Sequence, residues 1–87
     1  MPKHQPYYVY MLLCKNKSIY TGITDDIQRR LEQHKTGTGA RYTRSFGAVR
    51  ILYSERVSSR SLALKREYEI KTWSRSKKQE LVDSKKR

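Results

Sequence analysis

The spacing of apolar residues along this chain changes several times, and each change marks a different element. The run at residues 7–14 is apolar at odd and even positions alike and contains no glycine or proline. Such a run is typical of a strand that is buried on both faces and therefore central in its sheet. The polar residues 15–18 predict a turn and residues 19–23 predict a second short strand, so the two strands form a hairpin.

Farther along, the pattern predicts a third strand between helices. Residues 49–57 alternate, and Val49, Ile51 and Tyr53 are expected on one face of that strand. The predicted helices run from about 25 to 34, from 59 to 73 and from 76 to 82. Their expected caps are Asp25 with Gln28, Ser58 or Ser59, and Ser76 with Gln79, and Gly37 is the expected stop of the first helix. The predicted element order is therefore β-β-α-β-α-α.

Basic side chains outnumber acidic ones by a wide margin. The chain has 20 Lys and Arg against 8 Asp and Glu in 87 residues, a formal charge of +12. A domain with this balance usually binds a polyanion, and nucleic acid is the first expectation. A ribosome-associated protein, or a merely well-solvated one, would have the same charge, because attraction to phosphate carries no chemical information. The element order excludes the double-stranded-RNA-binding module, which begins with a helix, and the RRM signature is missing.

Length and cysteine content exclude several further classes. A chain this short buries one modest core, so we expect a single domain at 7–82 with flexible ends at 1–6 and 83–87. Cys14 is the only cysteine, which excludes an internal disulfide and a Cys/His zinc cluster. No apolar run reaches about 18 residues and no signal-peptide core follows the start. We therefore expect no membrane association and a cytoplasmic location.

The first predicted helix carries polar residues on the stripe that should face the sheet. Arg30 and His34 follow Ile27 at helical spacing. Arg30 either extends to solvent at the edge of the stripe or points into a cleft to meet a phosphate. Tyr10 and Tyr20 lie on the hairpin strands, where ring packing is the ordinary explanation, but a phenol facing Arg and Glu can also orient or deprotonate a water molecule.

The second predicted helix places a carboxylate on its apolar arc. Glu67 lies near the middle of the arc that Ala63 and Ile70 define. An unpaired carboxylate in a dry core costs several kcal/mol, so Glu67 needs a partner. That partner is either an arginine, with Arg30 and Arg66 as the candidates, or a metal ion.

The spacing of these residues resembles the GIY-YIG nuclease family, most closely its small stand-alone bacterial members, which are largely uncharacterised. Tyr8-Val9-Tyr10 and Tyr20-Thr21-Gly22 are similar to the two tripeptides that name the family. Arg30 follows Gly22 by eight residues, where the family has its catalytic arginine, and His34 stands where members have His or Tyr. Residues 63–67 resemble the helix that presents the family's metal-binding glutamate, Glu67. The resemblance implies a three-stranded antiparallel sheet flanked by helices, an α+β fold.

The chain also departs from the family pattern. Tyr8 replaces the first Gly of the name motif and Thr21 replaces its Ile or Val, and neither change touches a reacting group. Ile23 stands where excision-repair members have a Lys, and no Asn follows Glu67. These last two departures bear on the strength of cleavage more than on the fold.

The function that the resemblance implies is endonucleolytic hydrolysis of DNA phosphodiester bonds, in repair or recombination, with one Mg²⁺ or Mn²⁺ ion. Glu67 would hold the metal, Arg30 would stabilise the phosphate, and Tyr10 would handle the proton of the attacking water with help from Tyr20 or His34. The candidate nucleic-acid contacts are Arg41, Arg44, Lys77 and Lys78. A partner protein is expected to target the substrate, because the chain has no room for a separate DNA-recognition domain. The alternative is a non-catalytic module that binds RNA or the ribosome, although such a module has no need of a carboxylate in a basic cleft.

Overall fold

The computed structural model describes residues 6–37 and 47–85, and its elements follow the predicted order β-β-α-β-α-α. The elements are β1 (Tyr7–Cys14), β2 (Ile19–Thr24), α1 (Ile27–Thr36), β3 (Ala48–Val57), α3 (Arg60–Lys71) and α4 (Arg75–Ser84). The expected α+β class is confirmed. None of the helices in these two ranges is long and apolar enough to cross a membrane.

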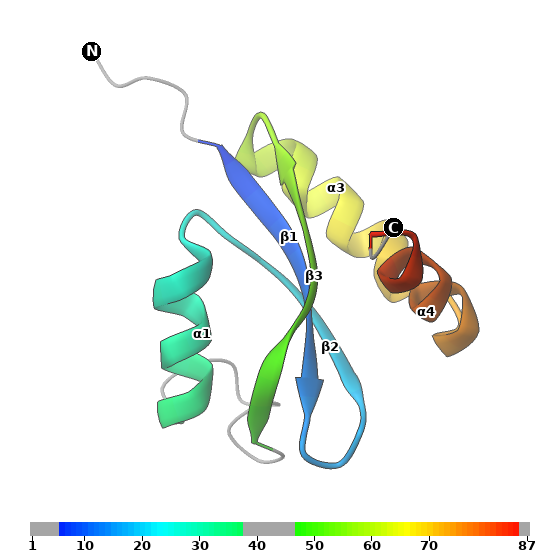
Figure 1. Cartoon of the computed structure of the whole chain (residues 1–87). Coiled ribbons are helices and arrows are strands. Elements are labelled where there is room, and N and C mark those ends of the chain that lie inside the picture. Colours follow the sequence, from blue (N-terminus) through cyan, green and yellow to red (C-terminus); the bar gives the residue numbers. More distant parts are fainter. Residues whose placement is uncertain (1–5, 38–46, 86–87) are drawn as a thin grey trace.

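The three strands form one antiparallel sheet in the order β2-β1-β3, so β1 is central, as its two-sided apolar pattern predicts. Helix α1 lies on one side of the sheet, and α3 and α4 lie on the other (Figure 1). Since successive side chains of a strand point to opposite faces, Val9 and Met11 face α3 and α4, whereas Tyr10 and Leu12 face α1. The sheet therefore separates the core on the side of α3 and α4 from the face that carries Tyr10 and Leu12.

The main hydrophobic core fills the space between the sheet and the two C-terminal helices. Its buried members are Val9, Met11, Tyr53, Ala63, Ile70 and Val82. Ala63 and Ile70 lie on the same face of α3, seven residues apart, which matches the apolar arc expected from the sequence. This packing fixes the direction of α3, and with it the position of Glu67.

The expected alternation in the third strand is wrong. Val49, Ile51 and Tyr53 do not share one face, because the register between β1 and β3 shifts twice. Tyr53 pairs with Met11 and Ile51 pairs with the next residue, Leu12, so Leu52 has no opposite partner. Each bulge of this kind adds one residue to β3 and exchanges the faces that follow, and Val49 is left 40% exposed.

Two of the expected helix caps are also wrong. Asp26, not Asp25, caps α1 by accepting from the backbone N–H of Arg29 at 3.0 Å. The hydroxyl of Thr24 accepts from the Asp26 backbone N–H at 3.1 Å, and this turn sets the start of the helix one residue later. The predicted stop is confirmed, because Gly37 adopts a left-handed φ of 84°.

The two C-terminal helices differ from the prediction at their ends. Ser59 caps α3 by accepting from the backbone N–H of Leu62, but the helix ends at Lys71 rather than at residue 73. Ser74, not Ser76, caps α4 through the backbone N–H of Lys77, so α4 spans 75–84 instead of 76–82. Both serines suit the cap equally well in the sequence, and the early end of α3 selects the first of them.

Candidate active site

Two tyrosines and a histidine meet on the α1 side of the sheet. The Tyr10 hydroxyl and Nε2 of His34 share a hydrogen bond of 2.7 Å, although 24 residues separate them. The Tyr20 ring lies 6.3 Å from the Tyr10 ring and 5.3 Å from the His34 ring, between ring centres. Tyr20 pairs with Leu12 and Tyr10 pairs with Gly22, so strand alternation places both phenols on one face.

A glycine on the edge strand makes room for the Tyr10 ring. A Cβ atom at Gly22 would lie 2.7 Å from the Tyr10 hydroxyl oxygen and 2.9 Å from a Tyr20 ring carbon. Neither distance is possible for real atoms, so any side chain at this position would displace the phenols. Tyr10 therefore leans from the central strand across Gly22 toward the edge of the sheet.

Arg30 comes from the half-buried side of α1, beside the tyrosines. One guanidinium nitrogen donates to the side-chain oxygen of Gln33 at 2.9 Å, and this contact orients the fork. The Nε atom of Arg30 is buried and has no hydrogen-bond partner in ranges 6–37 and 47–85. A buried donor without an acceptor costs about 1–3 kcal/mol, so Arg30 is poised for an acceptor that a bound anion would provide.

The two groups that share the hydrogen bond are both neutral near pH 7. Burial raises the pKa of Tyr10 to about 12, although the neighbouring Arg30 guanidinium opposes this rise. Burial, assisted by the positive charge of Arg30, lowers the pKa of His34 to about 4. One of the two ring nitrogens of a neutral imidazole is an acceptor, so His34 is able to receive a proton.

Glu67 belongs to α3, on the other side of the sheet from Arg30, but its charge acts on Tyr10, which forms the tyrosine cluster with Tyr20 and His34. Burial is the main cause of the raised pKa of Tyr10, and the phenol of Tyr20 and, least of all, the Glu67 carboxylate add to it. Its ion-pair partner is Lys71, one turn along α3, at 3.3 Å. Neither arginine that the sequence offered pairs with it among the described residues, because Arg66 pairs with Glu55 and Glu69 instead.

A polar cleft of about 230 Å³ is lined by residues from both sides of the sheet, and among the described residues Arg30 is the one predicted site residue that lines it. The cleft lies around the end of the edge strand β2, where the sheet stops. Its lining residues are Tyr7, Ile23, Thr24, Asp25, Arg29, Arg30, Gln33 and Arg60. Arg30 of α1 and Arg60 at the start of α3 therefore line the same cleft.

None of the four predicted nucleic-acid contacts is among the described residues that line the cleft. Arg41 and Arg44 lie outside the described residues. Lys77 and Lys78 belong to α4, and the Lys77 ammonium group lies 4.4 Å from the centre of the Trp73 ring. They are thus on the core side of the sheet, and no measured contact joins them to the tyrosine cluster.

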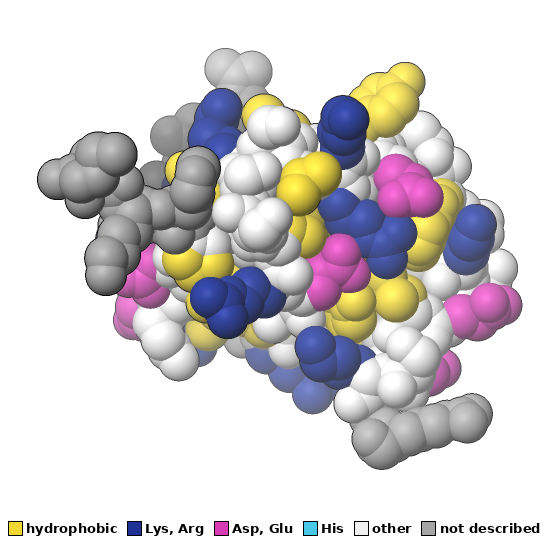
Figure 2. Space-filling model, turned by 90° about the horizontal axis from the view of Figure 1, so that it is seen from above, with side chains coloured by type: hydrophobic (Ala, Val, Ile, Leu, Met, Phe, Trp, Pro, Cys, Tyr) yellow, Lys and Arg dark blue, Asp and Glu magenta, His cyan; other side chains and the backbone are white. Residues whose placement is uncertain are grey.

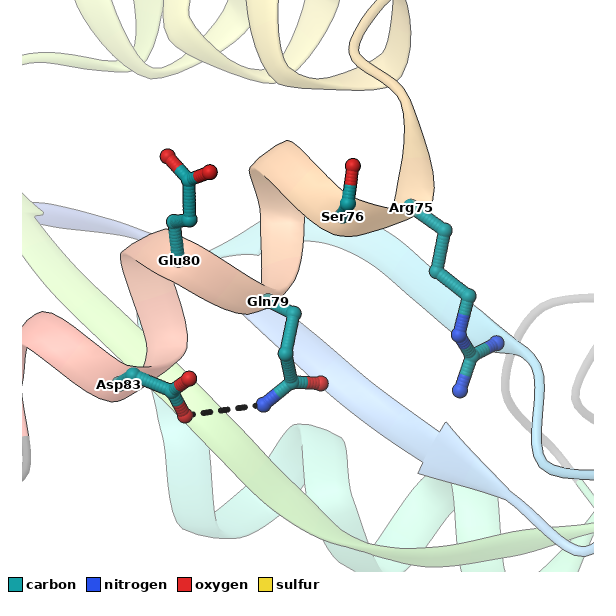
Figure 3. A pocket seen from close by; sticks show the side chains of 5 residues that line it. All are labelled: Arg75, Ser76, Gln79, Glu80 and Asp83. Atoms are coloured by element: carbon teal, nitrogen blue, oxygen red, sulfur yellow. Dashed lines mark hydrogen bonds between the residues drawn. The ribbon is translucent and has the colours of Figure 1, made fainter.

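A larger hollow of about 540 Å³ lies on α4 and includes none of the predicted site residues. Figure 3 shows its five lining side chains, all projecting from this one helix, with a hydrogen bond between Gln79 and Asp83. A surface view from above shows Lys and Arg side chains interleaved with acidic and hydrophobic groups (Figure 2). The positive charge on this face is therefore divided into small groups, and the chemically distinctive part of the molecule remains the cleft at the end of β2.

Comparison with known proteins decides the family. The model of the GIY-YIG catalytic domain matches residues 6–80. The chain belongs to the GIY-YIG family. A UPF0213 protein of Staphylococcus saprophyticus is 48% identical over 94% of this chain and 96% of its own length, and one of Haloquadratum walsbyi is 46% identical over 88% and 86%. The solution structure of a UPF0213 protein from Bacillus halodurans is 45% identical, covers 92% of this chain and 85% of its own, and superposes with a TM-score of 0.59.

Two residues that line the cleft, Gln33 and Arg60, are not among those that the sequence patterns single out. Gln33 stands three residues after Arg30, which is the spacing of neighbouring side chains on a helix. Arg60 stands at the start of a helix, where an arginine is ordinarily a surface residue. A signal was present, since Arg60 precedes Glu67 by seven residues, two helical turns, and so lies on the same line of α3.

The His34 environment of this GIY-YIG domain predicts a loss of stability in acid. The folded-state pKa of His34 is about 4, below its ordinary 6.5, so its contribution is complete above pH 6.5 and is lost as the pH falls through 4. A shift of this size corresponds to about 3 kcal/mol. Urea unfolding between pH 7 and pH 4 should show a steep decline for the parent and a shallower one for His34→Gln, which does not titrate. Parallel declines in the two proteins would contradict the buried neutral imidazole.

Proposed function

We propose that this protein is an endonuclease that hydrolyses phosphodiester bonds of DNA with the help of one divalent metal ion. The observation that carries the proposal is the Tyr10 phenol, which is hydrogen-bonded to His34 and subject to the charges of both Arg30 and Glu67. The phenol, the imidazole and the guanidinium on the α1 side of the sheet supply a proton acceptor, a relay and a phosphate clamp, and the Glu67 carboxylate, which comes from α3, would supply the cation ligand. Membership of the GIY-YIG family supports the same reaction.

The protein's own groups perform complementary steps in the proposed hydrolysis. The planar guanidinium of Arg30 binds the scissile phosphate and stabilises the charge that builds on it, using the Nε atom that now lacks an acceptor. Tyr10 accepts a proton from the attacking water as its own proton passes to Nε2 of His34 along the 2.7 Å hydrogen bond. The water oxygen then bonds to phosphorus, the bond to the leaving oxygen breaks, and that oxygen takes up a proton from solvent water, while His34 releases the proton it received to solvent.

Proton transfer toward His34 depends on the substrate. In the free protein the pKa values of about 12 for Tyr10 and about 4 for His34 oppose it. A bound phosphate brings negative charge to the cleft, which raises the pKa of His34 and favours the imidazolium. The pair is therefore inactive until a phosphodiester is in place.

Glu67 is the residue that would hold the metal. Its side chain is 18% exposed, so water reaches it, and its one ion-pair partner is a half-exposed lysine. The described residues contain no group of three His, Cys, Asp or Glu side chains arranged for a metal. A single carboxylate, completed by water and phosphate oxygens, suits Mg²⁺ better than a metal that needs a full protein cage. When bound there, the ion would polarise the phosphate and stabilise the leaving oxygen.

The test is cleavage of supercoiled plasmid by the purified protein, with and without Mg²⁺. We expect nicked circles to accumulate with Mg²⁺ and not in EDTA, because Glu67 and the ion act together on the phosphate. Mn²⁺ is expected to replace Mg²⁺, since both accept oxygen ligands. A protein that binds the plasmid but does not nick it under any of these conditions would be a binding module on the same fold.

A further inference from the structure

The cleft at the end of β2 carries more positive charge than the proposed reaction uses. It is lined by three arginines, Arg29, Arg30 and Arg60, and by one carboxylate, Asp25. Asp25 pairs with Arg29 across one turn of α1. This pairing leaves Arg30 and Arg60, which come from different helices, facing one space without a carboxylate between them.

Arg60 has no structural duty that explains its position. It is exposed on the first turn of α3, and no ion pair or hydrogen bond of its side chain occurs within 6–37 and 47–85. Ser59 caps the helix, so the helix start does not depend on Arg60. Two like charges on a shared cleft repel each other, and phosphates of a strand bound along the cleft would offset that repulsion.

Arg60 lies on the same side of α3 as Glu67, the residue that would hold the metal in the proposed reaction. Seven residues separate Arg60 from Glu67, which corresponds to two helical turns or about 10 Å along the axis. Phosphates follow one another at about 3.4 Å of axial rise per nucleotide in duplex DNA. A strand that runs along α3 with its scissile phosphate near Glu67 would therefore bring another phosphate to Arg60 within about three nucleotides.

We propose that Arg60, beside Arg30, forms a second phosphate-binding subsite that holds the substrate strand a few nucleotides from the bond that is cut. This inference rests on the proposed function for the identity of the strand, but the contact itself requires only a phosphodiester. The subsite aligns the strand along α3 and reads no base, because a guanidinium contact with phosphate is independent of sequence.

The experiment compares Arg60→Gln with Arg75→Gln in metal-free binding of a labelled DNA duplex over a range of salt concentrations. Arg75 is a matched control, since it is exposed at the start of another helix and has no measured ion pair in the described chain. Loss of one phosphate contact should weaken binding at low salt and reduce the slope of log affinity against log salt by about 0.9. Arg75→Gln should keep the parental slope, and Arg60→Lys should restore most of it. Equal slopes for Arg60→Gln, Arg75→Gln and the parent would overturn the subsite.

Two further measurements separate the possible failures. If the parent nicks plasmid and Arg60→Gln keeps the parental slope, the subsite is wrong and the nuclease stands. If the parent never nicks plasmid and Arg60→Gln has a smaller slope of log affinity against log salt than the parent, the phosphate contact stands and the proposed nuclease activity is wrong. Inorganic phosphate at constant ionic strength should displace DNA equally weakly from both proteins. Displacement at low phosphate concentration that Arg60→Gln abolishes would assign the cleft to a free phosphate ligand and overturn its role in holding a strand.

Discussion

Replacing Glu67 with glutamine is expected to reduce plasmid nicking by about 10²–10³ while DNA binding is retained. The substitution keeps the size of the side chain but removes the charge that would hold the metal ion. Binding depends on many of the 20 basic side chains, so it should survive. Without metal it should equal or exceed the parental affinity, since the substitution removes a negative charge that repels phosphate. Initial rates of nicking and fluorescence anisotropy in EDTA measure the two quantities.

Glu69→Gln is the matched control for this prediction. Glu69 lies on the same helix, is 56% exposed and pairs with Arg66 on a different face, so its loss should not change nicking. Neither substitution should unfold the domain, because ion pairs between residues three or four positions apart on a helix contribute about 0.3–0.5 kcal/mol. A Glu67→Gln protein that nicks at the parental rate would remove Glu67 from the reaction and with it the metal site.

The sheet and the residues on its α1 face follow from local patterns, which is why the sequence predicts them well. An apolar run without breakers can only be a central strand or a buried helix segment, and the polar turn at 15–18 favours a hairpin. Strand alternation then places Tyr10 and Tyr20 together, and helical spacing places His34 on the inner stripe of α1. These relations depend on residues fewer than about 30 positions apart, so no long-range information is needed.

The errors have a different origin, because they depend on contacts that local spacing does not contain. Asp25 and Asp26 are equally good caps in the sequence, and the bond between Thr24 and the Asp26 backbone decides between them. The two bulges in β3 arise where it pairs with β1, and its own residues alternate without any sign of them. The sequence likewise cannot show that α3 crosses near the end of β2, and this crossing alone brings Arg60 into the cleft.

The partner of Glu67 shows the same division between local and long-range information. Its place on the apolar arc of α3 is local and was predicted, but the expected arginine partner was wrong. Arg66 is held by Glu55 from β3, and Arg30 donates to Gln33. Lys71, one turn along the helix, takes the carboxylate instead. An exposed lysine is a weak and replaceable partner, so Glu67 keeps its capacity to bind a cation.

Replacing Arg30 with alanine should also reduce nicking by about 10²–10³, through the loss of the phosphate clamp. The change in stability should be no more than about 1 kcal/mol, because loss of the hydrogen bond to Gln33 is offset by removal of the buried Nε donor that lacks an acceptor. A buried ion pair with Glu67 would instead cost about 3–5 kcal/mol. Thermal melts separate these two values. Arg30→Lys keeps the charge without the planar fork and should lie between the parent and alanine in rate.

Arg30→Ala also has a readout that does not depend on cleavage. The positive charge of Arg30 is the second cause of the low pKa of His34, after burial. Its removal should therefore raise the pKa of His34 from about 4 toward the ordinary 6.5, without reaching it, since burial remains. A titration of the His34 ring signals by NMR measures this shift directly. An unchanged pKa would place Arg30 away from the Tyr10–His34 pair, and the proposed clamp would then act on a phosphate that the proton relay does not reach.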